Sequence, residues 1–490
     1  MNNIFRMMKN IEVYFSESTI RSARKCAKRL MTVLNSRGGA HKKTVLLAYG
    51  GGKDSSYMVA YVRYIQGLVM AEQGHTFQLR INTNRHAGMN DSVIENIDRV
   101  YRALDIYEDE TVDCLITDGL QIQPFKRHIK MPEFVRQQNR TDVLMNGHRF
   151  QADARSTFCN ACNLSMVNSF GLAANYNGGV DVIITGDSPK EQAAYVAWAR
   201  HLSRLFNTPK VNQKFGFSAF LETLDNVSQA YFRNIYGTES ISKSHRITFR
   251  LPRNPSFFNI YQDTAYEAGA HWALLTEFLN FSFDPLMFSF SESDCGNPTL
   301  MAHIRGLRAE TLLKRSYAEG IREYVCFATN IMKQKDFPTQ LIAEINRRYG
   351  NEEAIMLQRQ RAEQFAQEAF NLSTQQLVCM IYSPFTERGK NLTSYLTQEN
   401  IAIPESFIHN VLSNYNTIIS PSLENDLNKL SGLSLQQLRQ CYHNHLVSSL
   451  LEAKSGDPLS RILRYDPHKA VIQVQNGVTQ HVVSEIISGR

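Results

Sequence analysis

The chain has 490 residues, of which 43% are hydrophobic and 20% are charged, and its formal net charge is +7. This balance is typical of a folded globular protein with two or three domains, and it excludes a disordered or fibrous chain. No apolar run reaches the eighteen residues that a membrane span needs, and eight scattered cysteines fit a reducing compartment, so we expect a cytoplasmic protein without a membrane partner.

The N-terminal segment, residues 1–40, is expected to be a basic helical extension. Residues 1–43 hold ten Lys or Arg against two Glu. A helix over residues 18–36 would carry its positive charges on one side, namely Arg21, Arg24, Lys25, Lys28 and Arg29. Such a face attracts a polyanion, while a solvated outer helix face is the simpler interpretation, and both stay open here.

Strand-like and helix-like patterns alternate from residue 44 onward. Apolar runs at residues 44–48, 77–82, 111–117 and 180–185 predict buried strands, and helical spacing follows the first two over 55–71 and 92–104. Because parallel neighbours need crossover connections, this alternation predicts a doubly wound, mostly parallel α/β sheet within residues 41–210. Ligands of such sheets bind at the carboxyl ends of the strands.

The remainder divides into two parts. Residues 211–330 have a mixed pattern that does not resolve into a topology, with a second basic segment at 243–253. Residues 331–490 are expected to be mainly helical, with helices near 338–349, 352–371 and 434–454. The pair Asn476-Gly477, flanked by alternating apolar residues, predicts a closing β-hairpin over 470–487.

A glycine-rich turn follows the first strand, with the sequence Tyr49-Gly50-Gly51-Gly52-Lys53-Asp54-Ser55-Ser56. Glycines let the backbone approach a phosphate closely, and amides at the start of the next helix point toward an anion that the helix dipole favours. The turn fits neither the G-x-x-x-x-G-K-[ST] loop nor G-x-G-x-x-G. A different kind of phosphate loop is therefore predicted.

The run from Gly50 to Ser55 resembles the S-G-G-x-D-S signature of the PP-loop ATP pyrophosphatases, an adenine nucleotide alpha-hydrolase-like superfamily that splits ATP into AMP and pyrophosphate. The resemblance implies that Gly51, Gly52 and Ser55 cradle the ATP phosphates, that Asp54 holds Mg²⁺ and that Lys53 assists catalysis. Flanking contacts are expected from Ala48, Tyr49 and Ser56. Gly50 departs from the signature, because it replaces a serine and removes a hydroxyl.

Two further positions are assigned to the nucleotide. The run at 182–185 ends on Gly186-Asp187, and the resemblance implies that such a strand end lies beside the nucleotide. Asn82 closes the second strand, where sheets of this kind often meet the adenine.

The cysteine pair Cys159 and Cys162 has the C-x-x-C spacing of a metal or redox site. The order of phosphate loop, cysteine pair, helix and strand-glycine is similar to the tRNA 2-thiocytidine synthetase branch. That resemblance implies a [4Fe–4S] cluster on Cys159, Cys162 and a later cysteine, for which Cys295 is the candidate. Zinc, a redox pair and two incidental cysteines stay as alternatives.

The expected function is adenylation of a carbonyl oxygen on a second substrate, followed by displacement of AMP by sulfur. The thiolated acceptor would be a transfer RNA base or a small heterocycle, with a sulfur donor protein as partner. The alternatives are an ATP-dependent amide ligase that takes ammonia or an amine, with a sugar among its acceptors and an ammonia donor protein, and an inactive nucleotide-binding scaffold. A homodimer stays open.

Overall fold

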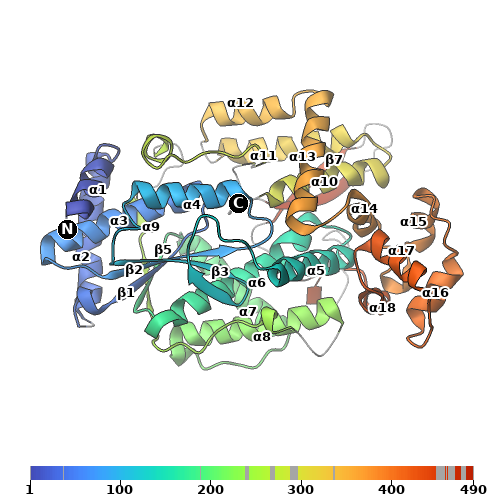
Figure 1. The fold of residues 1–490 in the computed structure, drawn as a ribbon, viewed down its shortest axis with the longest axis horizontal. Helices are drawn as coiled ribbons and strands as arrows, with labels where there is room; N and C mark the ends of the chain where they lie inside the picture. Colours follow the sequence, from blue (N-terminus) through green and yellow to red (C-terminus); the bar gives the residue numbers. More distant parts are fainter. Residues whose placement is uncertain are drawn as a thin grey trace.

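The chain is described here by a computed structural model. It describes residues 2–36, 38–187, 189–237, 242–264, 271–286, 288, 296–334, 337–447, 458–459, 461, 469–475 and 482–488. Within these residues the protein is an α/β structure with a mostly parallel sheet and a helical C-terminal region (Figure 1).

The central sheet has six strands in the order β4-β3-β2-β1-β5-β6. Its members are β1 (Thr44–Ala48), β2 (Gln78–Arg85), β3 (Val112–Asp118), β4 (Gln121–Pro124), β5 (Val182–Thr185) and β6 (Ser256–Asn259). All neighbours are parallel except β3 and β4, which form an antiparallel edge. From β1, the strands β2, β3 and β4 follow on one side and β5 and β6 on the other. The strand order therefore reverses between β1 and β5.

Alternating side chains of the inner strands belong to two different cores. In β1, Val45 and Leu47 pack on one face and Leu46 on the other. In β5, Val182 and Ile184 join the first of these cores and Ile183 joins the second. Since successive strand residues point to opposite faces, this pattern is the consequence of a sheet that is covered on both sides.

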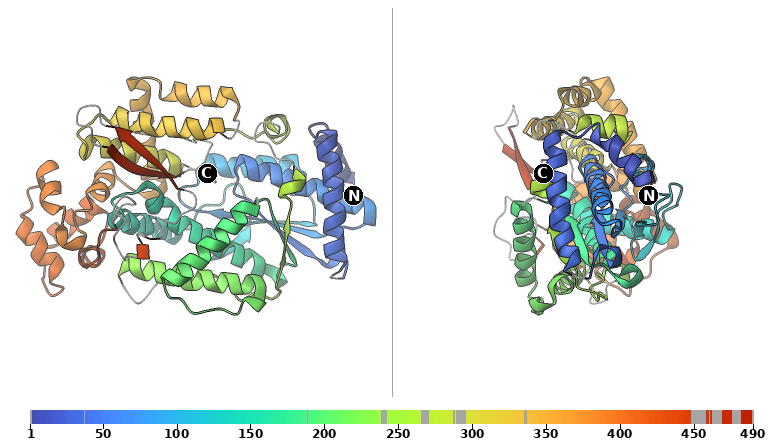
Figure 2. Two further views of the ribbon diagram at one scale, coloured as in Figure 1. Left: turned by 180° about the vertical axis from the view of Figure 1, so that it is seen from behind. Right: turned by 90° about the vertical axis from the view of Figure 1, so that its left-hand side faces the viewer.

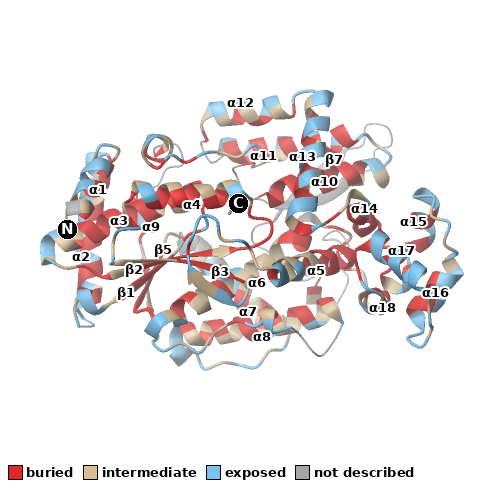
Figure 3. Cartoon of the chain, viewed as in Figure 1, coloured by how far each residue is buried: buried red, intermediate tan, exposed pale blue. Residues whose placement is uncertain are grey.

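Each face is covered by its own helices (Figures 1 and 2). The first core is built with α1 (Asn2–Glu12), α2 (Glu17–Asn35), α3 (Lys53–Gln73) and α4 (Asp91–Ala103). The second core is built with α5 (Glu133–Arg149), α6 (Ala154–Asn175), α7 (Pro189–Leu205) and α8 (Gly216–Tyr236). α3 is buried on nearly every side, whereas α2 keeps one exposed face (Figure 3).

The helical region continues the second core and does not form a core of its own. Its helices are α10 (Asn297–Thr311), α11 (Tyr317–Gln334), α12 (Thr339–Arg348), α13 (Glu352–Phe370), α14 (Thr374–Tyr382), α15 (Leu392–Gln398), α16 (Glu405–Ser413), α17 (Pro421–Ser431) and α18 (Leu435–His443). One apolar cluster extends from Leu46 in the sheet to Leu438 in α18. None of the described helices is long and apolar enough to cross a membrane.

Residues 211–330, whose pattern does not resolve into a topology, contribute a strand to the sheet, because β6 pairs in parallel with β5 and completes one edge. One expectation needs correction. The helix expected over 434–454 ends at His443, since the chain then turns away to donate from Val447 N to Arg149 O at 2.9 Å. Residues 448–454 lie outside the described residues.

The closing hairpin is present as β7 (Lys469–Gln475) and β8 (Val482–Ser488), which pair antiparallel. Gln475 pairs with Val482, so the connection is longer than the two-residue turn that was expected. Asn476 and Gly477 themselves lie outside the described residues.

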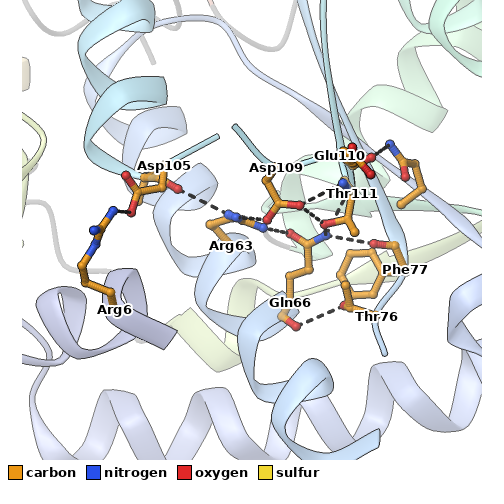
Figure 4. Close-up of polar contacts among 11 residues, drawn as sticks. Arg6, Arg63, Gln66, Thr76, Phe77, Asp105, Asp109, Glu110 and Thr111 are labelled. Carbon is orange, nitrogen blue, oxygen red and sulfur yellow. Dashed lines mark hydrogen bonds and ion pairs between the residues drawn. The ribbon is translucent and has the colours of Figure 1, made fainter. Parts of the chain in front are cut away.

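A buried polar network anchors the amino end of the sheet (Figure 4). Arg63 of α3 donates to the carboxylate of Asp109, and Gln66 Nε2 donates to Phe77 O at 2.9 Å. Asp109 also accepts from the hydroxyl of Thr111 at 2.6 Å. The far end of α3 is thereby tied to the starts of β2 and β3, which leaves its N-terminus at the opposite, carboxyl end of the sheet.

Candidate functional site

The glycine-rich loop joins β1 directly to the N-terminus of α3. Gly52 is the N-cap residue, with extended backbone angles, and the hydroxyls of Ser55 and Ser56 donate to its carbonyl at 3.0 and 2.8 Å. Tyr49 is buried, and its Oη lies 2.8 Å from Ser56 Oγ. These bonds preform the turn, and the first amides of α3 have no acceptor within the helix. The loop therefore has the backbone arrangement that is expected of an anion-binding helix N-terminus.

Gly51 gives the loop its tight path. Its φ is +77°, in the region that favours glycine, and a Cβ there would lie 2.5 Å from Val93 Cγ1 of α4. Gly50, in contrast, is exposed, and its nearest neighbour would be Ser55 Oγ at 3.9 Å. The loop is thus packed against α4 on one side and open on the other.

The end of β5 lies on the other side of this opening. Gly186 packs against α3, since a Cβ there would lie 2.6 Å from Met58 Sδ. The carbonyl of Asp187 accepts from Asn259 Nδ2 at 2.7 Å, which ties it to the end of β6. The phosphate loop and Gly186-Asp187 therefore flank the point between β1 and β5 where the strand order reverses, which is where open α/β sheets bind ligands.

Lys53 and Asp54 differ sharply in exposure. The Lys53 side chain is 5% exposed and that of Asp54 is 59% exposed, with Nζ 2.8 Å from Oδ1. The ammonium also lies 4.7 Å from the ring centroid of Phe337, on the connection between α11 and α12. The helical region thus contacts the phosphate loop, an arrangement that the sequence did not indicate.

The predicted adenine contact, Asn82, lies inside the sheet. It is 5% exposed and faces Ala48 in the strand register. Its Nδ2 donates to Ser169 Oγ at 2.7 Å, and its Oδ1 accepts from Thr117 Oγ1 at 3.0 Å. Both ends of the amide are therefore engaged in holding α6 and β3 against β2.

The predicted cysteine pair lies in the second turn of α6, which crosses the face of β2. Ser165 Oγ and Asn84 Oδ1 are 3.4 Å apart, so this half of α6 extends past the carboxyl end of β2. Cys159 and Cys162 are both partly exposed; Cys159 packs against the second core, and Cys162 lines a pocket.

This pocket opens beside the ends of β2 and β3. Its wall includes His86, Gly119, Asp142, Cys162, Ser165 and His245. β2 and β3 lie one and two strand spacings from β1, about 5 and 10 Å. The pocket and the glycine-rich loop thus both lie at the carboxyl edge of the sheet. Burial lowers the pKa of His86 to about 4, so this ring is neutral near pH 7.

The predicted metal sites comprise a cluster on Cys159, Cys162 and Cys295 and Mg²⁺ on Asp54. Among the described residues no group of three His, Cys, Asp or Glu is arranged to hold a metal ion. Cys295 lies outside the described residues, but the next residue, Gly296, donates to Gly88 O at 2.9 Å, and Asn297 lines the same pocket as Cys162. A cluster held by three cysteines therefore stays a prediction, as does Mg²⁺ on the exposed Asp54.

Asp142 and His245 are the pocket residues that sequence reasoning missed. Asp142 lies within α5, where nothing in the local pattern indicates burial, and His245 was assigned to a basic segment on a loop or edge. In the structure both side chains are at least nine-tenths buried, and His245 Nε2 lies 2.9 Å from Asp142 Oδ1. The two residues are 103 positions apart, so no local signal could have paired them.

The basic segments differ in how far they are neutralised. At 243–253, Arg246 bonds to Asp225 at 2.7 Å and Arg253 to Asp181 at 2.8 Å, while Lys243 and Arg250 are exposed. The five basic residues expected on the polar side of α2 are all exposed, while Arg29 pairs with Asp263 at 2.8 Å. An RNA partner stays a prediction.

The geometry defines an α/β protein with a candidate anion-binding loop at the reversal point of its sheet. No family model, no curated protein and no solved structure matches the chain.

Proposed function

We propose that the protein binds ATP on the loop of residues 50–55 and uses it to adenylate a carbonyl oxygen of a second substrate. The observation that carries the proposal is the position of this loop. It caps the 21-residue helix α3 at the reversal point of a parallel sheet, opposite Gly186-Asp187. That position, together with the S-G-G-x-D-S-like run, supports a PP-loop type of nucleotide site.

Each part of the loop then has a role. The first amides of α3 and the helix dipole hold the polyphosphate, and the exposed Asp54 carboxylate is placed to hold Mg²⁺, which neutralises charge on the departing pyrophosphate when bound. Lys53 exchanges its contact with Asp54 for a phosphate oxygen. The acceptor oxygen attacks the α-phosphorus, the bond to the β-phosphate bridging oxygen breaks, and pyrophosphate leaves.

The second step displaces AMP from the activated carbon. The position of Cys162 in the adjacent pocket favours sulfur as the incoming nucleophile. Iron and sulfide content of protein purified without oxygen tests this choice. Bound iron and sulfide support thiolation, whereas a metal-free protein that still makes AMP supports the amide-forming alternative.

Calorimetric titration with Mg-ATP tests the nucleotide site itself. We expect Asp54→Ala and Gly52→Val to weaken binding at least tenfold, about 1.4 kcal/mol. Asp91→Ala is the matched control, because Asp91 is an exposed acidic residue in the first turn of the neighbouring helix α4. Thermal unfolding of each variant verifies its fold. Parent-like binding by both loop variants, or no binding by the parent, would overturn the proposal.

A further inference from the structure

The pocket beside the phosphate loop contains a buried carboxylate whose hydrogen bonds are all on one oxygen. Asp142 Oδ1 accepts from Tyr236 Oη at 2.6 Å and from Gln138 Nε2 at 3.1 Å, and it lies 2.9 Å from His245 Nε2. Within the described part of the chain, Oδ2 of Asp142 has no hydrogen-bond partner. This oxygen is not fully buried, so it is open to a hydrogen-bond donor that enters the pocket from outside the protein.

No arginine or lysine supplies that donor within the described residues. Arg246, the nearest cation in sequence to His245, directs Nε and Nη2 to the carboxylate of Asp225, at 2.7 to 3.1 Å. His245 contacts Asp142 Oδ1 through Nε2, and its Nδ1 is itself buried with no hydrogen-bond partner among the described residues. The wall of the pocket therefore has unmet hydrogen-bonding capacity that a ligand can satisfy.

The rest of the wall selects a flat ligand. It includes four aromatic rings, those of Phe134, Phe158, Phe232 and Phe370. Phe232 stacks on His245 with ring centroids 3.6 Å apart, which fixes the imidazole beside the carboxylate. The cavity volume is about 60 Å³, room for roughly four water molecules. It therefore takes the edge of one small ring, with the rest of the ligand outside the mouth.

We propose that this pocket binds the acceptor substrate, and that the acceptor is a planar nitrogen heterocycle whose N–H donor contacts Asp142 Oδ2. The assignment rests on the proposed function, because the glycine-rich loop at the same carboxyl edge of the sheet then supplies the activated phosphorus. A hydrogen bond from an N–H group to a carboxylate is directional and charge-assisted, and aromatic side chains pack against the faces of a flat ring.

Binding of small probes to the full-length protein tests the pocket. Calorimetry or ligand-observed NMR with 2-aminopyrimidine and with benzamidine, both flat and rich in N–H donors, should give saturable binding. 2-Methoxypyrimidine, which has a similar shape and no N–H, should bind at least tenfold more weakly. Equal binding of 2-aminopyrimidine and 2-methoxypyrimidine, or no saturable binding of the amino probes, overturns the proposal.

Two variants locate the binding. Asp142→Asn removes the negative charge and keeps the shape of the side chain, and it should weaken the binding of benzamidine at least tenfold. Glu133→Gln removes one charge from an exposed position of the same helix, so it controls for a general electrostatic effect. Asp142→Asn can unfold the protein, so Phe134→Ala provides a second test. The Phe134 ring is half exposed, and its loss should also weaken binding of the probes. Parent-like affinity in both Phe134→Ala and a folded Asp142→Asn contradicts the assignment.

Competition identifies the source of the heterocycle. Displacement of benzamidine by free amino-substituted bases supports a small-molecule acceptor, and displacement by lower concentrations of a short single-stranded RNA supports a base within RNA. Mg-ATP binding is measured in separate samples without probe. If the protein binds the probes but not ATP, the proposed function is wrong and the pocket still binds a flat ligand. If the protein binds ATP but not the probes, only the assignment of the pocket is wrong.

Discussion

Side chains of neighbouring helices approach the backbone closely at two glycines of the candidate site. At Gly51 the approach comes from Val93 and Ile97 of α4 and is combined with a positive φ. At Gly186 it comes from the flexible side chain of Met58. Gly51 therefore leaves no room for a side chain, whereas Met58 can shift to make room at Gly186.

Gly51→Ala should destabilise the protein by about 1 to 3 kcal/mol, because the new Cβ must displace Val93 Cγ1 and adopt a strained φ. Gly50→Ala is the control one residue earlier, where the nearest atom is 3.9 Å away. It should change the free energy of unfolding by less than about 0.5 kcal/mol. Urea unfolding of both variants measures the difference, and equal values would show that the packing against α4 is not as tight as described.

At the scale of elements, the ends of helices are fixed by side chains from distant segments. α3 is tied at one end by Tyr49 and Ser56 and at the other by the network around Asp109 (Figure 4). The C-terminus of α8 is held by Arg149 of α5, whose guanidinium donates to the carbonyls of Asn234 and Ile235. A cation at a helix C-terminus also interacts favourably with the helix dipole.

Arg149→Met should cost about 2 to 4 kcal/mol, since Arg149 is 4% exposed and three carbonyls lose a charged donor, including His445 O at 2.9 Å. Arg136→Met is the matched control on the same helix, where the side chain is 42% exposed and its ion pair is long. Its effect should stay within about 0.5 kcal/mol. Hydrogen exchange should report faster opening of α8 in Arg149→Met; unchanged protection there would contradict the assigned role.

At the scale of the whole molecule, the second core joins the sheet to the C-terminal helices, and buried histidines lie where these parts meet. His148 of α5 lies 3.0 Å from Ser431 O of α17, and burial lowers its pKa to about 4. Burial also lowers the pKa of His303 in α10 to about 3. Both rings are neutral in the folded protein at pH 7.

These pKa values predict acid sensitivity. Above pH 6.5 the histidines are neutral in both states and contribute no pH dependence. Between about pH 6.5 and 4 the unfolded chain takes up protons that the folded chain does not, so stability falls as the pH falls. For His148 the free energy of unfolding falls by about 3 kcal/mol over this range. The fall ends near pH 4, where the His148 ring becomes protonated in the folded protein as well.

Urea unfolding at pH 7 and pH 4.5 measures this loss. His148→Gln keeps a donor toward Ser431 O and should reduce the difference between the two pH values. His128→Gln, at an exposed position, should leave the difference unchanged. The assignment would be wrong if the two variants showed the same pH dependence.

Local patterns predicted much of the α/β domain. The five residues of β1 coincide with the predicted run 44–48, and α4 begins and ends within one residue of 92–104. The loop and the helix after it were predicted as well, because strand periodicity, glycines and helical spacing are all properties of contiguous residues. The identity of the bound anion was not among these properties and stays a proposal.

By itself, the sequence determined the alternation of strands and helices, the position of the phosphate loop and the amphipathic α2. Only the tertiary structure decided that β6 joins the sheet, that Phe337 lies under Lys53 and that Asp142 meets His245 in a pocket beside the loop. The physical reason is distance along the chain. Backbone periodicity is set by near neighbours, whereas the burial of a charged side chain is set by helices that return to it a hundred or more residues later.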